Sequence, residues 1–509
     1  MTVGTFRHGV ASGDPTTNRV VIWTRVSDAA GDAPVAVRWR LFEADGGRPA
    51  GHGQTLARPE ADWTVSVDVG GLRPNTAYTY EFEVDGERSR TGRTRTLPDG
   101  DVGRTRFAQV SCAKYNAGHF NAYARLAERD DIAFVLHLGD WIYEASQNPP
   151  ASQTPSKDIG RPFDPLHECR TLEDYRTRYA QYRLDPDVQA VAAAHPFIGT
   201  VDDHEFADGA WRDGATEHKE DRDGPWSERK AAAFRAREEW QPVRRPEPAN
   251  PARVYRSARI GDLAEIFLLD TRTMRDEPVP PPALSRQGRT NLGPHQKAWL
   301  LSSLAGSDAH WRILGNPSVM ARTWNDELPE HVRKALVKVK LIDSDGTGPD
   351  WDQWDGYPEE RRELIRFIGE LDPQNVVVLS GDVHVGLATE LAEDHTMPPV
   401  AAEFVNTSLT SQNLDDKMGW AIRSESLAIE RAILEGMPHM HYVDLDSHGY
   451  GLVDLDRERL RFEWWTTGLG PDDRGQVMSH AMQVRRGETR PEPVPQTSPQ
   501  ATPESAAAV

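Results

Sequence analysis

Short apolar segments alternate with helical stretches along most of the chain after residue 104. The segments are FAQVS, IAFVLHLG, PFIGTV, AEIFLLD, WRILGN and VVVLSG, and the helical stretches include residues 121–129, 172–182, 226–240, 294–304 and 358–369. A short apolar run bounded by glycine or polar residues is typical of a buried parallel strand. Strands that alternate with helices predict a layered α/β domain. Three later strands, HYVDLD, GYGLVDLD and RLRFEWWTT, are expected to complete its second sheet, so that the domain spans residues 104–475.

The first part of the chain has a different pattern. Residues 1–99 contain short runs of alternating apolar and polar residues, such as VVIWTRV and TVSVDVG, which are separated by turn sequences such as GDPTTN and GLRPNT. Closely spaced runs of this kind are typical of a small β-sandwich. We therefore expect a β-sandwich domain over residues 1–99, ahead of the α/β domain.

The end of the chain is poor in residues that could form a core. Residues 485–509 are rich in proline, serine, threonine and alanine. A segment of this composition buries too little apolar surface to offset the entropy of ordering it. We expect residues 485–509 to form a disordered tail.

Charge and apolar content argue against several kinds of partner. The formal net charge of −20 argues against a basic groove for nucleic acid, and against attraction to anionic membranes as the main driving force. No apolar run approaches the roughly 18 residues of a membrane span, and the opening MTVGTFRHGV lacks the features of a secretory signal. We expect a monomer with no transmembrane segment. It would be secreted or associated with the cell wall if a leader was removed, and cytoplasmic otherwise.

Four of the predicted strands are followed by polar residues that could bind metal. These residues are Cys112 after FAQVS, Asp140 and Tyr143 after FVLHLG, Asp202, Asp203 and His204 after FIGTV, and Asp382 and His384 after VVVLSG. The carboxyl ends of parallel strands meet at one edge of a sheet, where ligands gather. These side chains are therefore expected to converge, and the pattern predicts a metal site.

The donor types divide into two groups. The thiolate of Cys112, the phenolate of Tyr143 and the imidazole of His384 suit an oxidised transition metal. The carboxylates of Asp203 and Asp382 suit a hard cation such as Ca²⁺ or Mg²⁺. The sequence therefore favours two different cations over one.

Asp140 could bridge the two cations, because its carboxylate suits both. Two cations a few ångströms apart can orient a phosphate, lower the pKa of a bound water and stabilise the transition state for attack on phosphorus. His204 then remains as a proton donor to the leaving oxygen.

The same motifs resemble those of a known family. VSCAKYN, LGDWIYE, VDDHEF and SGDVHVG stand in the order of the four motifs of the PhoD-like alkaline phosphatase and phosphodiesterase family, a branch of the metallophosphoesterase superfamily. The resemblance also includes the opening HGVASGDPTTNRVVIWTRV and the later NTSLTSQN, and covers nearly all of residues 6–465. It implies a metallophosphatase fold, which is a four-layer α/β/β/α sandwich, preceded by a small N-terminal β-sandwich.

The resemblance also implies roles for individual residues. It implies Cys112, Asp140, Tyr143 and His384 around Fe³⁺, Asp140, Asp203 and Asp382 around Ca²⁺, His204 as the catalytic histidine, and Asn316 where other superfamily members have a further metal ligand. Mg²⁺ or Mn²⁺ could replace Ca²⁺. Trp141 stands where the family usually has tyrosine, a difference expected to alter the pocket wall and the choice of substrate.

Several of these residues also have simpler interpretations. Asp202 could cap the turn that follows its strand instead of binding metal. Arg178 and Arg272 could grip phosphate in a bidentate manner or pair with acidic neighbours. Trp354, in WDQWDGY, could belong to a hydrophobic lid or pack at the entry to a helix.

The two cysteines, Cys112 and Cys169, also leave alternatives open. A cysteine beside a strand is usually a small buried hydrophobe, but Cys112 shares its strand edge with other donors and is expected to be a ligand. Cys169 has no such company and is expected to be a free thiol. A disulfide between the two would remove the thiolate.

Three functions compete. The first is a metal-dependent hydrolase of phosphate monoesters or diesters, and the second is a phospholipase D of the same family that releases headgroups from phospholipids. The phospholipase D mechanism with two H-x-K-x(4)-D motifs is excluded, because the partial match His295-Gln296-Lys297 has Ser302 in place of the aspartate. The third is a binding protein with a structural metal site, which the mixed donor set disfavours because structural sites are usually closed by four Cys or His ligands.

Overall fold

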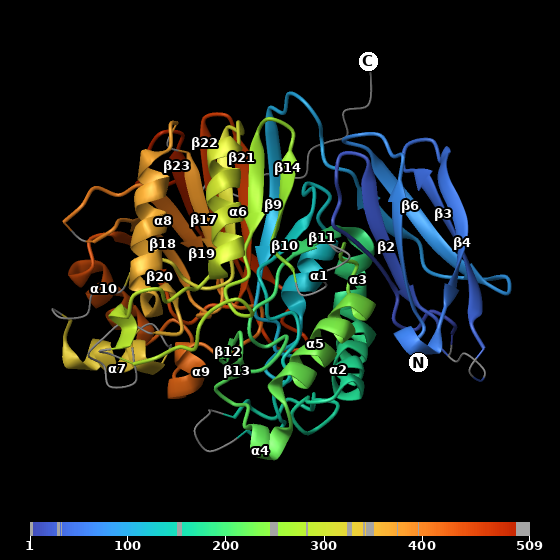
Figure 1. The fold of residues 1–509 in the computed structure, drawn as a ribbon, viewed down its shortest axis with the longest axis horizontal. Helices are drawn as coiled ribbons and strands as arrows, with labels where there is room; N and C mark the ends of the chain where they lie inside the picture. The colour runs from blue at the N-terminus through green and yellow to red at the C-terminus, as the bar shows by residue number, and fades with distance from the viewer. Residues whose placement is uncertain are drawn as a thin grey trace.

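Two large sheets lie face to face and are covered by helices on their outer faces (Figure 1). The computed structural model describes residues 4–27, 31, 33–149, 155–244, 253–280, 283–322, 328–338, 342, 351–373, 375–394 and 396–494. Within these residues the layers follow the order helix, sheet, sheet, helix. The predicted α/β/β/α arrangement is confirmed.

The first sheet has ten strands. In spatial order they are β24 (Glu492–Pro493), β23 (Gln476–Arg485), β22 (Arg459–Thr467), β21 (Gly449–Asp456), β9 (Arg104–Val110), β10 (Val135–His137), β11 (Pro196–Gly199), β1 (Val10–Gly13), β2 (Arg19–Arg25) and β5 (Thr64–Gly70). The pairs β9·β10, β10·β11 and β11·β1 are parallel. The segments that follow β9, β10 and β11 therefore leave the sheet at one edge.

The second sheet has seven strands. In spatial order they are β14 (Arg256–Ile260), β15 (Ala264–Leu268), β16 (Trp311–Asn316), β17 (Val376–Ser380), β19 (Ala401–Val405), β18 (Gly386–Leu391) and β20 (Met440–Asp444). Strands β15, β16, β17 and β19 run parallel to one another.

Ten α-helices lie within the described residues. They are α1 (Asn121–Ala127), α2 (Leu172–Leu184), α3 (Pro186–Ala194), α4 (Glu220–Asp223), α5 (Trp226–Trp240), α6 (Gly293–Gly306), α7 (Glu330–Lys338), α8 (Pro358–Glu370), α9 (Leu414–Met418) and α10 (Ser426–Gly436). Figure 1 shows α6 and α8 over the seven-stranded sheet, and α1, α2, α3 and α5 grouped near β10 and β11. Among these residues, no helix is long and apolar enough to cross a membrane.

Alternation along the strands explains why the sheets stack. In β17, Val377 and Leu379 face the core between the sheets, whereas Val376 and Val378 face the helical layer. The core between the sheets is dense in aromatic rings, and Phe404 stacks on Phe462 with ring centroids 5.4 Å apart. Burial of each such side chain contributes about 1.5–3 kcal/mol, so the two sheets are held as one body.

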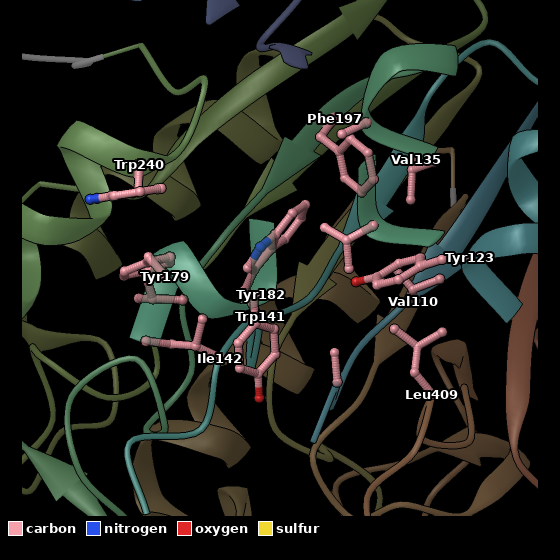
Figure 2. Close-up of a cluster of buried hydrophobic side chains, with 14 of the residues drawn as sticks. Val110, Tyr123, Val135, Trp141, Ile142, Tyr179, Tyr182, Phe197, Trp240 and Leu409 are labelled. Carbon is pink, nitrogen blue, oxygen red and sulfur yellow. The ribbon is translucent and has the colours of Figure 1, made fainter. Parts of the chain in front are cut away.

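The helical layer over the ten-stranded sheet forms a second core (Figure 2). Trp141 lies in this cluster with Tyr123, Phe197 and Tyr182, and its ring centroid is 4.7 Å from that of Phe197. Because Trp141 directly follows Asp140, this packing anchors one of the candidate metal-binding residues.

The strands predicted in residues 1–99 are present, but they divide between two sheets. Strands β4 (Pro49–Ala57), β3 (Val35–Glu43), β6 (Ala77–Val84), β7 (Glu87–Arg88) and β8 (Gly92–Arg95) form a separate sheet. Strands β1, β2 and β5 extend the ten-stranded sheet, where Ser12 pairs with Pro196. The N-terminal part of the chain is therefore joined to the ten-stranded sheet by backbone hydrogen bonds.

Two expectations about the C-terminal part need correction. Of the three strands expected in the second sheet, only β20 joins it, whereas β21 and β22 extend the first sheet from β9. The ordered chain also passes residue 475, because β23 pairs with β22 and β24 pairs with β23. The predicted tail therefore includes an ordered first part. Residues 495–509 lie outside the described residues.

His195, at the end of α3, is expected to make stability fall at low pH. The side chain is buried, and Nε2 lies 2.9 Å from the carbonyl oxygen of Leu126. Burial lowers the pKa of His195 to about 4, whereas an unfolded histidine has a pKa of about 6.5. The unfolded state therefore binds a proton that the folded state excludes, and stability falls as the pH drops through 6.5. The expected loss between pH 7 and pH 5 is about 2 kcal/mol.

Urea denaturation of the wild type and of His195→Asn at both pH values measures this contribution. The variant should lose about 2 kcal/mol less than the wild type between pH 7 and pH 5. His52→Asn, at an exposed position of β4, gives the baseline for removing a histidine. Equal pH dependence in the wild type and His195→Asn would contradict the prediction.

Candidate metal centre

The loops that follow β9, β10, β11 and β17 carry the candidate metal-binding residues. Four of these residues have a left-handed backbone: φ is 61° at Cys112, 57° at Asp140, 69° at Asp382 and 63° at His384. Residues other than glycine rarely adopt this conformation, which costs of order 1–3 kcal/mol each and is concentrated at functional sites. Four such residues, in loops that follow strands of both large sheets, indicate that the loops are shaped for a site.

Gly139 allows two of these loops to approach each other. Its φ is +94°, and a Cβ atom at this position would lie 2.4 Å from Cβ of Asp202. Any larger residue would push apart the loops that follow β10 and β11. The glycine of the Gly-Asp pair is therefore required by packing.

The first group of donors contains Cys112, Asp140 and His384. Their ligand atoms lie within 4.8 Å of one another. The phenolic oxygen of Tyr143 joins them, at 2.8 Å from Oδ2 of Asp140 and 3.3 Å from Nε2 of His384. These are the four residues expected around the transition metal.

The second group contains Asp140, Asp202, Asp203 and Asp382, whose oxygen atoms also lie within 4.8 Å of one another. Oδ1 of Asp203 is buried and, among the described residues, has no hydrogen-bond partner. An unpaired buried carboxylate oxygen is costly unless a cation or water contacts it. The residues therefore fit a hard cation, and Asp140 belongs to both groups.

The surroundings of several donors favour their protonated forms. Burial, together with the neighbouring Asp203, Glu205 and Asp382, raises the pKa of Asp140 well above its usual value. Burial also raises the pKa of Cys112 and Tyr143. Metal ligands of these types bind in their deprotonated forms. Cation binding is therefore expected to release protons.

Two residues of the loop after β19 orient the first group. The backbone oxygen of Gln412 lies 2.9 Å from Nδ1 of His384, which leaves Nε2 directed toward Tyr143. The hydroxyl of Ser411 donates to the phenolic oxygen of Tyr143 at 2.6 Å. Hydrogen bonds of this kind fix the tautomer and ring orientation of metal-binding histidines. The motif SLTSQ therefore supports the site without supplying a metal ligand.

His204 forms a dyad with Glu144. Nδ1 of His204 lies 2.8 Å from Oε2 of Glu144, and the other oxygen accepts a hydrogen bond from the backbone nitrogen of Asp208 at 2.7 Å. Burial disfavours the charged ring, but Glu144, Asp140 and Asp203 raise the pKa of His204 well above its usual value. The ring of His204 also lies over that of Tyr143, with centroids 4.0 Å apart.

Glu144 and Glu205 are site residues that the sequence analysis did not single out. Glu205 accepts hydrogen bonds from the backbone nitrogens of Asp140, Trp141 and Asp202 at 3.1, 2.5 and 2.7 Å. Both glutamates stand inside recognised motifs, as the last residue of GDWIYE and of DDHE. Their position beside the candidate donors was the only signal in the sequence.

Arg272 pairs with acidic residues. Its guanidinium donates to Oδ2 of Asp382 at 2.6 Å and to Oδ2 of Asp352 at 2.6 Å, and it also pairs with Asp202. The side chain of Arg272 is fully buried. Arg272 was expected either to bind phosphate or to pair with acidic neighbours, and the structure shows the pairing. Asp202 lies both in the carboxylate group and in an ion pair with Arg272.

Three other residues that were candidates to contact substrate or metal form hydrogen bonds within the protein instead. Arg178 is buried and donates to the carbonyl oxygens of Pro165 at 2.8 Å and Asp164 at 3.1 Å, so it holds a loop. Trp354 is buried in the core, and its Nε1 donates to Oδ1 of Asn316 at 3.0 Å. The amide of Asn316 donates to Oγ of Ser380 at 3.2 Å, so the polar atoms of Asn316 are already bonded.

Trp141 is likewise buried in the hydrophobic cluster of Figure 2. Of the interpretations offered for Trp354 and Arg178, the structure shows helix-entry packing for Trp354 and internal hydrogen bonds for Arg178. Sequence patterns identify residues near a site but do not determine the direction in which a side chain points. Cys112 and Cys169 are both free thiols, so they are not joined in a disulfide.

Comparison with known proteins identifies relatives of this chain. The family model of the PhoD-like phosphatase matches residues 107–464, and the model of the N-terminal domain of that phosphatase matches residues 2–98. The chain is 35% identical over 471 residues to alkaline phosphatase D of Bacillus subtilis (strain 168), covering 87% of this chain and 74% of that protein. A solved structure of PhoD matches with a TM-score of 0.83 and 30% identity, and covers 98% of this chain and 94% of that chain. The chain therefore belongs to the PhoD-like phosphatase family of phosphoric ester hydrolases.

Proposed function

We propose that this protein hydrolyses phosphoric esters with two bound cations, Fe³⁺ and Ca²⁺. Cys112, Asp140, Tyr143 and His384 would hold Fe³⁺, and Asp140, Asp203 and Asp382 would hold Ca²⁺, with Mg²⁺ or Mn²⁺ as substitutes. The observation that carries this proposal is the pair of adjacent donor groups that share Asp140. The donor types support the assignment, because thiolate, phenolate and imidazole suit an oxidised transition metal and carboxylates suit Ca²⁺. The similarity to alkaline phosphatase D supports a phosphate ester as the substrate.

The protein residues would supply the proton for the departing group. When bound, the two cations orient the phosphoryl group and activate a water molecule for attack on phosphorus. Glu144 binds Nδ1 of His204, so Nε2 remains to protonate the leaving oxygen. The carboxylate of Glu144 favours the imidazolium form, which is the form that can donate this proton.

Chelation of Ca²⁺ tests whether Ca²⁺ and Fe³⁺ occupy separate sites. EGTA should abolish hydrolysis of bis-nitrophenyl phosphate, and added Ca²⁺ should restore it. The visible absorption of a tyrosinate bound to Fe³⁺ should persist, because thiolate and phenolate hold iron more tightly than carboxylates hold Ca²⁺. Loss of colour and activity in step during EGTA treatment would contradict the two-cation assignment.

Phospholipase D activity is the second candidate function, and one observation favours it. Met418, Ile422 and Leu427 are 38%, 59% and 40% exposed. They follow Ser411 and Gln412, which contact the candidate iron-binding residues. Exposed apolar side chains in the segment that follows these two residues would suit an acyl-bearing substrate. The other face of this segment packs on the core, where Ile429 and Ile433 of α10 are buried.

Relative kcat/KM values distinguish the two candidate substrates. The substrates are bis-nitrophenyl phosphate, nitrophenyl phosphate and a short-chain phosphatidylcholine, each in the presence of Ca²⁺. We expect diesterase activity at least equal to monoesterase activity, and headgroup release from the phospholipid. A preference for the monoester above about tenfold would reject the acyl-bearing diester as the preferred substrate.

The binding-protein hypothesis has lost its support, because the chain belongs to a family of enzymes.

A further inference from the structure

Residues 352–354 contact the candidate metal centre from outside the four motifs. Three consecutive side chains each bind a residue located at or after the carboxyl end of a strand of the seven-stranded sheet. Asp352 accepts from Arg272 at 2.6 Å, Gln353 donates to Asp382 at 2.6 Å, and Trp354 donates to Asn316 at 3.0 Å. The segment is therefore built into the site, although it supplies none of the predicted donors.

Gln353 is held at both ends of its amide. Oε1 accepts a hydrogen bond from the backbone nitrogen of Val319 at 2.7 Å, and Nε2 donates to Oδ2 of Asp382 at 2.6 Å. The side chain is buried. Because a backbone N–H can only donate, the oxygen of the amide must face Val319 and the nitrogen must face Asp382. The direction of the bond to Asp382 is therefore determined.

The two oxygens of Asp382 are in different situations. Oδ2 accepts from both Gln353 and Arg272, each at 2.6 Å. Oδ1 has no hydrogen-bond donor among the described residues. Both donors therefore act on one oxygen and fix the plane of the carboxylate, which leaves the other oxygen available to a cation.

The two donors to Asp382 both orient its carboxylate but differ in charge, and therefore differ in their effect on cation binding. The guanidinium of Arg272 carries a full positive charge, and it neutralises the carboxylate as well as orienting it. The amide of Gln353 is neutral, so it orients the carboxylate and leaves its charge for a cation. Without Gln353, the carboxylate would be held by Arg272 alone and would be free to turn toward the guanidinium.

We propose that Gln353 is a positioning residue that sets the affinity of the carboxylate group for the hard cation. This inference rests on the proposed function, because it concerns the cation expected at Asp140, Asp203 and Asp382. Gln353 acts through Asp382 and contacts neither substrate nor cation. Neighbours that support metal ligands typically change metal affinity by about 10 to 100-fold when they are replaced.

Gln353→Met tests the proposal, because methionine has a similar length and removes both hydrogen bonds. EGTA first removes Ca²⁺ from the iron-loaded variant, which is then titrated with Ca²⁺ in a calorimeter. Its dissociation constant for Ca²⁺ should be about 10 to 100-fold higher than that of the wild type. The visible iron band should not change, because among the described residues Gln353 forms no hydrogen bond with any of the four proposed iron ligands. At saturating Ca²⁺, kcat should return to within about threefold of the wild type, a difference below 1 kcal/mol.

Asn375→Leu is the matched control. Asn375 is also a buried amide, and it directly precedes β17, at the end of the strand away from the site. Nδ2 of Asn375 donates to the carbonyl oxygens of Ala309 at 3.0 Å and His310 at 2.7 Å. This variant loses buried hydrogen bonds as Gln353→Met does, but its Ca²⁺ affinity should stay at the wild-type value.

The possible results separate this inference from the proposed function. The inference is wrong and the proposed function stands if the wild type binds Ca²⁺ and the dissociation constant of Gln353→Met lies within about threefold of the wild-type value. If the wild type binds no Ca²⁺, both are wrong. If Gln353→Met does not fold, Gln353→Asn provides the same test, because its amide is one methylene too short to reach both Val319 and Asp382. Wild-type affinity in Gln353→Asn would likewise overturn the inference.

Discussion

Cys112→Ala is expected to lose the visible iron band and more than about 100-fold in kcat/KM for bis-nitrophenyl phosphate. The thiol of Cys112 lies with Asp140 and His384 in the first donor group, where their ligand atoms are within 4.8 Å of one another. A thiolate supplies negative charge and a soft donor, and a methyl group supplies neither. Loss of a donor should therefore exceed the about 10 to 100-fold effect of losing a supporting neighbour. Iron content, the absorption spectrum and kcat/KM measure the effect.

Cys169→Ala is the control for Cys112→Ala. Cys169 is also a buried free thiol, but its sulfur contacts the backbone oxygen of Asp174 at 3.6 Å and lies in a hydrophobic cluster. Its replacement should leave iron content and turnover close to the wild type. Normal iron content and turnover in Cys112→Ala would refute the assignment of the thiolate.

His204→Ala is expected to slow the hydrolysis of esters with poor leaving groups far more than that of nitrophenyl esters. An alkoxide needs a proton as it departs, and loss of a general acid typically costs about 10² to 10⁴-fold in kcat. Nitrophenolate departs with little protonation, so its loss should be about tenfold or less. Paired kcat measurements on an alkyl and a nitrophenyl diester give the comparison.

Two further variants define the role of the His204 dyad. Glu144→Gln keeps a polar partner for Nδ1 of His204 but removes the charge, so it should show the same dependence on the leaving group with smaller losses. His167→Ala, at a side chain that is 63% exposed, should have no effect on either substrate. Equal losses on both substrates in His204→Ala would mean that His204 positions the phosphate and does not protonate the leaving group.

Local sequence predicted a layered α/β domain and most members of the two donor groups, whereas the four-layer order was implied by the family resemblance. Buried parallel strands appear as short apolar runs, and a residue that directly follows such a strand must lie at the sheet edge. Cys112, Asp140, Asp203 and Asp382 each follow a strand within a few residues, so each was expected at a sheet edge. The first three follow strands of the ten-stranded sheet and Asp382 follows a strand of the seven-stranded sheet, so the stacking of the two sheets brings them together. The predicted strands of residues 1–99 rested in the same way on local alternation.

Tertiary structure alone decided which strands became neighbours and where the side chains beside the site point. Strand β21 pairs with β9 although they are separated by more than 300 residues, and no local pattern encodes a pairing at that distance. Trp141 and Trp354 stand next to site residues in the sequence, yet they point into hydrophobic cores, because the large apolar area of each ring is worth most when it is buried. Gln353 shows the converse. It lies outside the four metal-binding motifs, and it reaches Asp382 because the segment before α8 folds back over the ends of β16 and β17. Sequence thus determined the donors through their distance from strand ends, whereas the supporting contacts depended on packing between distant segments.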